Sequence, residues 1–249
     1  DRILVPSEHV RRIYRNHGIN PEKLSLIPYG YDPSVFYPDE SKYDSDETRI
    51  ITVATPHFRK GLDLLRSVSD VARRSDTAWR IHNPFEVDSN PNEFWIDPWV
   101  QRDLEERGFT VTKGCLDESD LGRTLRRSHL CVQPSRSEGF GLVALEAMAA
   151  GTPVLTTDWG GHLDFKGAGM ITISGSLTSA GRCQYHQRQP ESEIFEPDAV
   201  QFRSVIRNLV EDSEQLRDLG YAARETVKEL TWGRTAEKLI NILSEEYSS

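Results

Sequence analysis

The chain has 249 residues, of which 37% are hydrophobic, which suits one large globular domain or one domain with part of another. Its net charge of −9 argues against a protein that binds nucleic acid through a broad basic surface. No apolar run is long enough to span a bilayer, and the first residues lack the layout of a signal peptide. We therefore expect a cytoplasmic protein, whose three scattered cysteines, Cys115, Cys131 and Cys183, are reduced.

The first part of the chain predicts a strand, a helix and a second strand. Residues 3–5 are apolar, and Ser7 is a typical N-cap for a helix that runs to about His17. A second strand is expected at 24–28, followed by a turn-rich connector. The polar and acidic segment 39–48 then resembles a linker.

From residue 50 onward, strands and helices alternate. The pattern predicts strands at 50–54, 79–82, 109–111, 130–132, 153–156 and 171–173, and helices at 61–74, 99–107, 119–127, 141–150, 197–212, 213–230 and 232–247. This order predicts an α/β fold, a Rossmann-like parallel sheet with helices on both faces. Ligands of such sheets bind at the carboxyl ends of the strands. The long loop 85–99 is a further candidate for a functional segment.

The strongest local signal lies between the strand at 130–132 and the helix at 141–150, where residues 134–142 read PSRSEGFGL. Two glycines at a helix start expose backbone N–H groups that can receive phosphate oxygens or a sugar hydroxyl. Taken alone, however, such a turn more often contains glycine because its backbone conformation requires it than because a ligand binds there. Glu138 alone can be a partner of the helix dipole, and Glu146 alone can point to solvent.

Taken together, Glu138 and Glu146 match the E-x7-E motif of retaining GT-B glycosyltransferases, and residues 147–154 match the segment directly after that motif in glycosyltransferase family 4. Other matching parts occur in the right order along nearly the whole chain: Pro6-Ser7, the hinge 27–32 with Phe36 and Pro38, Lys60-Gly61, Gly114, Gly160-Gly161 and Thr231-Trp232. The chain therefore resembles the C-terminal, donor-binding domain of this family.

The resemblance implies a role for each matching residue. Glu146 would accept hydrogen bonds from both hydroxyls of the donor ribose. Glu138 would hold the transferred sugar, and Lys60 would neutralise the departing diphosphate, so these two are the expected catalytic residues. Backbone groups would complete the donor site, with the sugar and distal phosphate near Gly139, Phe140, Gly141 and Leu142, and the nucleobase near Cys115 and Leu116.

Two departures from the family pattern affect this site. Ala54-Thr55 stands where the family commonly has Gly-Arg, so Thr55 replaces an arginine that contacts the diphosphate. Arg59 or Arg136 could substitute for that cation, although a solvated arginine is the simpler account of each. Asn83-Pro84 stands where a glycine usually follows the strand, which leaves the loop after it hard to interpret.

The resemblance also implies a domain organisation. Residues 1–38 would be the end of an N-terminal acceptor domain and the interdomain hinge, 39–48 an acidic linker, 49–231 the donor-binding domain and 232–249 a helix that crosses back toward the first domain. Most of the acceptor domain would then be missing, either trimmed or supplied by another chain. Without it, this chain alone would be inactive.

The expected function is the donor half of a retaining hexosyltransferase that needs neither metal nor cofactor. It would transfer a sugar from a UDP- or GDP-linked donor to an acceptor hydroxyl. The alternative is a non-catalytic module that binds a nucleotide sugar and needs a partner with an acceptor domain. A third interpretation is a GT-B epimerase, hydrolase or phosphorylase.

Other polar clusters carry weaker signals. The pair Cys183-x-x-His186 lacks a second pair of ligands, so we expect no metal site. Two basic clusters on predicted helices could contact an anionic membrane surface or a lipid-linked acceptor, although most such clusters are solvated faces. These clusters are Arg11, Arg12 and Arg15, and Arg123, Arg126 and Arg127.

Overall fold

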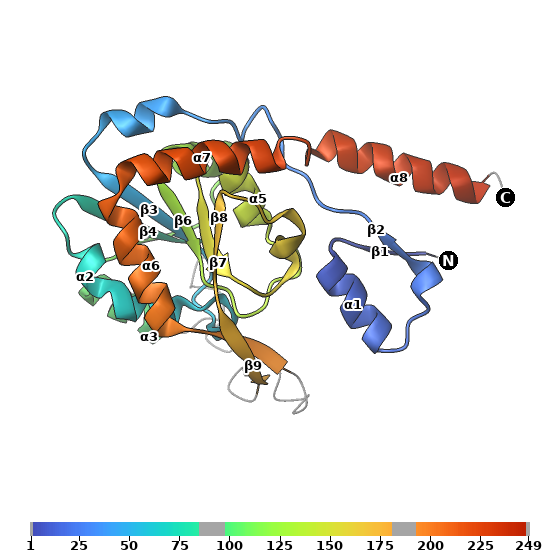
Figure 1. Ribbon diagram of the computed structural model, residues 1–249, viewed down its shortest axis with the longest axis horizontal. Coiled ribbons are helices and arrows are strands. Elements are labelled where there is room, and N and C mark those ends of the chain that lie inside the picture. The colour runs from blue at the N-terminus through green and yellow to red at the C-terminus, as the bar shows by residue number, and fades with distance from the viewer. Residues whose placement is uncertain (1, 85–97, 181–192, 248–249) are drawn as a thin grey trace.

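A six-stranded parallel sheet forms the body of the chain in the computed structural model, which describes residues 2–84, 98–180 and 193–247 (Figure 1). The strand order is β5-β4-β3-β6-β7-β8. The strands are β3 (Thr48–Val53), β4 (Thr77–Asn83), β5 (Thr110–Lys113), β6 (Leu130–Gln133), β7 (Val154–Thr157) and β8 (Met170–Ile173). Strands β3, β4 and β5 follow one another toward one edge of the sheet. The chain then returns to place β6 on the other side of β3, and β7 and β8 continue toward the opposite edge. The loops after β3 and β6 therefore leave the sheet next to each other.

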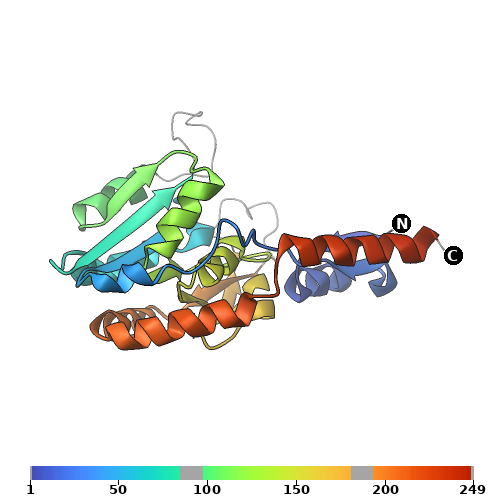
Figure 2. The ribbon, with the colours of Figure 1, turned by 90° about the horizontal axis from the view of Figure 1, so that it is seen from above.

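Helices cover both faces of this sheet (Figures 1 and 2). One face carries η4 (Leu62–Val68), α2 (Ser69–Ala72), α3 (Pro98–Glu106) and α6 (Ala199–Glu211). The other carries α4 (Glu118–Arg126), α5 (Leu142–Ala149) and the second half of α7 (Ser213–Val227). Within the described ranges, no helix combines the length and the apolar character needed to cross a lipid bilayer.

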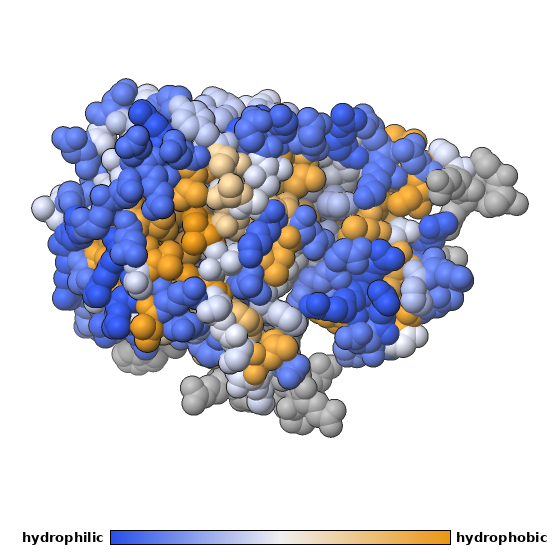
Figure 3. Space-filling view, in the orientation of Figure 1, coloured by the Kyte–Doolittle hydropathy of each residue, from blue (hydrophilic) through white to orange (hydrophobic). Residues whose placement is uncertain are grey.

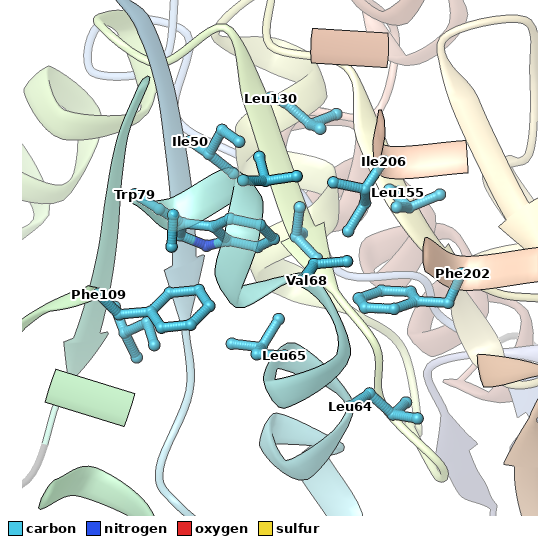
Figure 4. Packing of buried hydrophobic residues seen from close by; sticks show 14 of the residues in the cluster. Ile50, Leu64, Leu65, Val68, Trp79, Phe109, Leu130, Leu155, Phe202 and Ile206 are labelled. Atoms are coloured by element: carbon cyan, nitrogen blue, oxygen red, sulfur yellow. The ribbon is translucent and has the colours of Figure 1, made fainter. Parts of the chain in front are cut away.

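Strands β3, β6, β7 and β8 supply apolar side chains to both layers, whereas β4 and β5 supply them to the layer beside η4 and α6. Ile50 and Ile51 are both 1% exposed, yet they belong to cores on opposite faces, because successive side chains of a strand alternate in direction. Figure 4 shows the core beside η4 and α6, where the rings of Trp79 and Phe109 meet edge to face at 5.1 Å. The buried indole N–H of Trp79 donates to Oγ1 of Thr52 at 3.2 Å, so no polar group of this residue is left unpaired.

The predicted fold class and the alternation of strands and helices are confirmed, with two differences. Residues 61–74 were expected to form one helix, but they form the 3-10 helix η4 and the short α2. The left-handed Gly61, with φ +71°, and the hydroxyl of Ser67, which donates to the carbonyl of Leu64 at 2.7 Å, favour tighter turns there. The antiparallel pair β9 (Gly175–Ser179) and β10 (Glu193–Pro197) was not predicted, because every residue of β9 is exposed and no apolar pattern marks it.

A small lobe stands beside the body and contains β1 (Ile3–Val5), α1 (Glu8–Asn16), the short 3-10 helix η1 (Pro21–Lys23) and β2 (Leu24–Leu26). The two strands pair in parallel, and Ser7 caps α1 by accepting from the amide of Val10, as the sequence predicts. Helix α8 (Trp232–Tyr247) extends from the body toward the side of this lobe (Figures 1 and 2).

The connection between lobe and body is fixed to the start of α8. Tyr31 bridges to Thr231, and the hydroxyl of Thr235 donates to the carbonyl of Pro28 at 2.8 Å. A Cβ at Gly30 would lie 2.2 Å from the carbonyl carbon of Thr231, so only glycine permits this approach. Farther along, α8 exposes Ile240 and Leu243, while the face shown in Figure 3 is mostly hydrophilic with separate apolar patches.

The segment expected to be an acidic linker packs against the body. It contains the 3-10 helix η2 (Glu40–Asp44), and Lys42 in it is 3% exposed. The ammonium of Lys42 donates to the carbonyl of Gly151 at 2.7 Å, just after the end of α5, and burial lowers its pKa to about 8. Nδ1 of His129 accepts from the amide of Arg49 at 2.9 Å, and its Nε2 lies 2.8 Å from the carbonyl of Lys42. This arrangement assigns a neutral ring with the proton on Nε2.

We predict that His129 makes the fold sensitive to mild acid. Burial lowers its pKa to about 4, so the folded protein takes up the proton later than the unfolded chain does on acidification. The stability supplied by the neutral ring is therefore complete above about pH 6.5 and is lost as the pH falls toward 4. Urea unfolding across this window should show roughly 2–3 kcal/mol less pH dependence in His129→Gln than in the wild type.

His17→Gln, the same substitution at an exposed histidine, is the control for the change of side chain itself. Equal pH dependence in His129→Gln and the wild type would contradict this assignment.

Candidate functional site

The loops after β3 and β6 bring Lys60 and Glu138 into contact. Lys60 ends the short 3-10 helix η3 (Phe58–Lys60), and its Nζ lies 2.7 Å from Oε2 of Glu138. Nη1 of Arg59 lies 4.0 Å from the same oxygen. The two loops approach closely because residue 61 is glycine, since a Cβ at Gly61 would lie 2.0 Å from the carbonyl oxygen of Pro134. The structure thus brings together three residues that the sequence assigned to one site.

Glu138 is held in its charged form by its neighbours. Burial acts to raise its pKa, but the cations of Lys60 and Arg59 lower it, and the net pKa lies below the usual value. The side chains of Lys60 and Glu138 are 20% and 22% exposed, so a ligand can reach both. The pair therefore offers an ammonium that suits a phosphate and a carboxylate that suits hydroxyl groups.

A cavity of about 200 Å³ opens at the amino end of α5. Gly141 precedes the helix with φ +92°, where no side chain covers the first turn. The amides of that first turn have no partners within the helix, and the helix dipole makes this end positive. With Lys60 beside it, this end of the helix suits an anion such as a phosphate. The lining residues are Lys60, Gln133, Ser135, Glu138, Gly141, Leu142, Val143, Ala144, Thr156 and His162.

Four polar lining residues were not singled out from the sequence: Gln133, Ser135, Thr156 and His162. The hydroxyl oxygen of Ser135 is buried, and the described part of the chain gives it no hydrogen-bond partner. Nε2 of His162 lies 2.7 Å from the carbonyl of Thr157, and burial lowers the pKa of this histidine. The available signal was position, since Gln133 and Thr156 lie at the carboxyl ends of β6 and β7.

Glu146 lies on α5 one turn beyond Leu142 and Val143, which both line the cavity. Side chains separated by three or four residues share a helix face, and each leans back toward the preceding turn. Glu146 is 8% exposed, and none of the described residues donates a hydrogen bond to its carboxyl oxygens. Burial, followed by the charge of Glu118, raises its pKa to about 8. An unpaired buried carboxyl group is costly to the fold.

The remaining predicted donor residues do not line this cavity. Phe140 is buried between Tyr29 and Phe165, at ring distances of 5.2 and 5.4 Å, so only its backbone can face a ligand. Gly139 is exposed, and its carbonyl accepts from the hydroxyl of Ser7 at 2.6 Å. Three others lie in strand-end loops: Thr55 after β3, and Cys115 and Leu116 after β5.

The two arginines considered as a second cation lie in different surroundings. Arg59 is beside Glu138 and is partly exposed. Arg136 is only 2% exposed, and its guanidinium donates to Asp63, Glu196 and the carbonyl of Phe58. These contacts use all five of its N–H donors, so a phosphate could bind Arg136 only by displacing an ion pair. Arg136 therefore does not replace the missing arginine, and Arg59 is the better placed of the two.

The two basic clusters are largely engaged within the chain. Arg12 lies over the ring of Trp159 at 5.1 Å, and Arg126 lies over the ring of Tyr37 at 4.2 Å. Arg11 pairs with Glu8, and Arg123 pairs with Asp120. Such contacts are typical of helix faces that are partly exposed to solvent.

Two expectations concern segments that the structure leaves largely or wholly undescribed. The loop 85–99 falls mostly in the gap 85–97, and the pair Cys183 and His186 lies within 181–192. Across the ranges that are described, no three or more His, Cys, Asp or Glu side chains gather in a way that could hold a metal ion.

Comparison with known proteins identifies the family. A model of the family described as family 4 glycosyltransferase in conflict systems matches residues 104–239. An α-(1→4)-mannosyltransferase of Mycolicibacterium hassiacum is 25% identical over 96% of this chain and 53% of its own length. A sulfoquinovosyl transferase of Arabidopsis thaliana is 27% identical over 100% of this chain and 45% of its own length. The chain thus spans about half the length of these relatives.

Solved structures share the fold. Sucrose-phosphate synthase of Thermosynechococcus elongatus has a TM-score of 0.76 at 23% identity, over 100% of this chain and 59% of its own. Anabaena HepE, solved in complex with UDP and glucose, has a TM-score of 0.74 at 12% identity, over 98% of this chain and 62% of its own. All these likenesses agree with the family match, which covers more than half of the sequence. The chain belongs to the family 4 glycosyltransferases, in the group described as occurring in conflict systems.

Proposed function

We propose that this chain is the donor-binding part of a retaining glycosyltransferase that uses a nucleoside-diphosphate sugar. Glu146 is the observation that carries the proposal, because it is a buried carboxyl group with no hydrogen-bond donor among the described residues. Folding alone gives no reason to bury such a group on the helix whose first turn lines the cavity. A ribose supplies two neighbouring hydroxyl donors, which match the two carboxyl oxygens.

The other contacts of the donor follow from charge. The diphosphate would meet Lys60, Arg59 and the positive end of α5, which supply cationic groups without a divalent metal ion. The anion of Glu138 would accept hydrogen bonds from hydroxyls of the transferred sugar. The unpaired hydroxyl of Ser135 would contact the same ligand.

In the proposed reaction, the bond between the anomeric carbon and the diphosphate oxygen breaks. A bond to the acceptor oxygen forms on the same face of the sugar, which retains the anomeric configuration. The proton of the acceptor hydroxyl passes to the departing diphosphate oxygen. Lys60 would stabilise the charge that develops on this oxygen, which is electrostatic stabilisation of the transition state.

The names of the relatives support a sugar-transfer reaction, and HepE, solved with UDP and glucose, supports a nucleoside-diphosphate donor. The proposal gives these residues to the donor and none to the acceptor. Donor binding is therefore the step that the proposal concerns most directly. If the chain binds a donor without turnover, that result would favour the alternative of a nucleotide-sugar-binding module.

We predict that the chain binds one of UDP, GDP or ADP with micromolar affinity, roughly −8 kcal/mol. Glu146→Gln should weaken this binding about 10- to 100-fold, because it removes a charged acceptor from the ribose hydroxyls. Isothermal titration calorimetry with the three nucleotides measures both effects.

Glu118→Gln is the matched control, since it changes the acidic neighbour of Glu146 and should retain binding. A folded wild-type sample that gives no binding heat with any of the three nucleotides would refute the donor site.

We further predict that Glu146 lowers stability in alkaline solution. Its pKa of about 8 means that the folded protein keeps a proton that the unfolded chain has already released, so stability falls as the pH rises from about 4.5 to 8. Glu146→Gln should therefore be more stable than the wild type at pH 8.5, by roughly 2–4 kcal/mol, and the difference should shrink at pH 5. Urea unfolding at the two pH values tests this.

A variant that is more stable and binds nucleotide less well would show that Glu146 is retained for its ligand. If Glu146→Gln is destabilised at both pH values, the carboxyl group has a structural role instead.

A further inference from the structure

Arg136 joins three segments around the site. It lies in the loop after β6, whereas Asp63 lies in η4 and Glu196 lies in β10. Nη1 and Nη2 donate to the two oxygens of Asp63 at 2.7 and 2.9 Å. Nε and Nη2 donate to the two oxygens of Glu196 at 2.9 and 2.8 Å. Two bidentate carboxylate pairs thus share one guanidinium that is 2% exposed.

The same residue holds η3, the short helix that carries Lys60. The fifth guanidinium donor, on Nη1, reaches the carbonyl of Phe58 at 2.9 Å, and the guanidinium carbon lies 4.0 Å from the centre of the Phe58 ring. The backbone amide of Arg136 donates to the carbonyl of Arg59 at 2.7 Å. Residues on both sides of Lys60 are therefore fixed to Arg136, since Asp63 lies just beyond it.

Arg136 also connects this site to the β9–β10 hairpin. The amide of Phe195 donates to the carbonyl of Arg136 at 3.2 Å, next to the ion pair of Glu196. Figure 1 shows the hairpin projecting from the body of the chain. Glu138 follows Arg136 closely in the same loop. The contacts of Arg136 therefore bear on the positions of both Lys60 and Glu138, which form an ion pair.

We propose that Arg136 is a positioning residue, which fixes η3 against the loop after β6 so that Lys60 is held at the distal phosphate of the donor. This inference rests on the proposed function, because the phosphate contact of Lys60 belongs to it. Arg136 itself does not touch the donor, since all five of its N–H groups are engaged. The ion pair between Arg136 and Glu196 also connects this loop to the β9–β10 hairpin.

The test compares a nucleoside diphosphate with the monophosphate of the same base. In the wild type the diphosphate should bind at least 10-fold more tightly, because only it reaches Lys60. Lys60→Ala should remove most of this preference without changing the affinity for the monophosphate. Arg136→Met should do the same, although it leaves Lys60 in place. Arg136→Lys should not restore the preference, since an ammonium lacks the planar fork that both carboxylates use.

A double mutant separates positioning from an independent effect. Lys60→Ala combined with Arg136→Met should lose no more preference than either change alone, because both act on the same contact. Arg207→Met is the matched control, since Arg207 forms an ion pair with Asp70 that is exposed on the surface. This control should keep the full preference.

The outcomes distinguish the two claims. If the wild type binds no nucleoside diphosphate, the proposed function fails. If the wild type binds the diphosphate and Arg136→Met keeps both its monophosphate affinity and its full preference, positioning by Arg136 is wrong. Fully additive losses in the double mutant would overturn it as well. Should Arg136→Met fail to fold, Glu196→Gln decides, because this side chain is 41% exposed and its loss should reduce the preference several-fold in a folded protein.

Discussion

The reversal of strand order between β3 and β6 is the constraint on which the rest of the site depends. It places the loops after these strands side by side, and Gly61 lets their backbones approach closely. Lys60 and Glu138, which are far apart in sequence, can therefore form an ion pair at the amino end of α5. The charged pair thus depends on this feature of the topology, and it lies beside the positive end of α5 at the cavity.

Glu138 and Glu146 lie in opposite electrostatic surroundings, which fits the two different tasks that we propose for them. Glu138 is stabilised as an anion by Lys60 and Arg59, and its pKa is lowered. Glu146 is buried without a partner, and its pKa is raised to about 8. The first carboxylate is ready to accept hydrogen bonds before a ligand arrives. The second gains its hydrogen bonds only when a ligand supplies donors. Ligand binding can therefore offset the free-energy cost of burying this carboxyl group in the folded protein.

The sequence predicted the parts of this protein that depend on local pattern. Apolar runs such as the one at Ile50 and Ile51 mark buried strands, and the order of elements gives the parallel sheet, so the loops after its strands could be expected at one edge. The choice of Lys60 and Glu138 within those loops came from the family resemblance. The contacts of Arg136 could not be predicted, because its partners lie 73 and 60 residues away in the chain and one belongs to a hairpin whose first strand, β9, has no apolar pattern. An arginine close to a candidate binding site resembles a ligand-binding residue until its contacts are known.

Proton release on nucleotide binding tests the central claim, that Glu146 receives the ribose of the donor. The free protein should hold a proton on Glu146 at pH 7, because burial raises its pKa to about 8. Two ribose hydroxyls that donate to this group favour its anion, so binding should expel that proton. Calorimetric titration of the nucleoside diphosphate at pH 7, in buffers of different ionisation enthalpy, should show up to one proton released by the wild type and markedly less by Glu146→Gln. Equal proton release from both proteins would contradict the account.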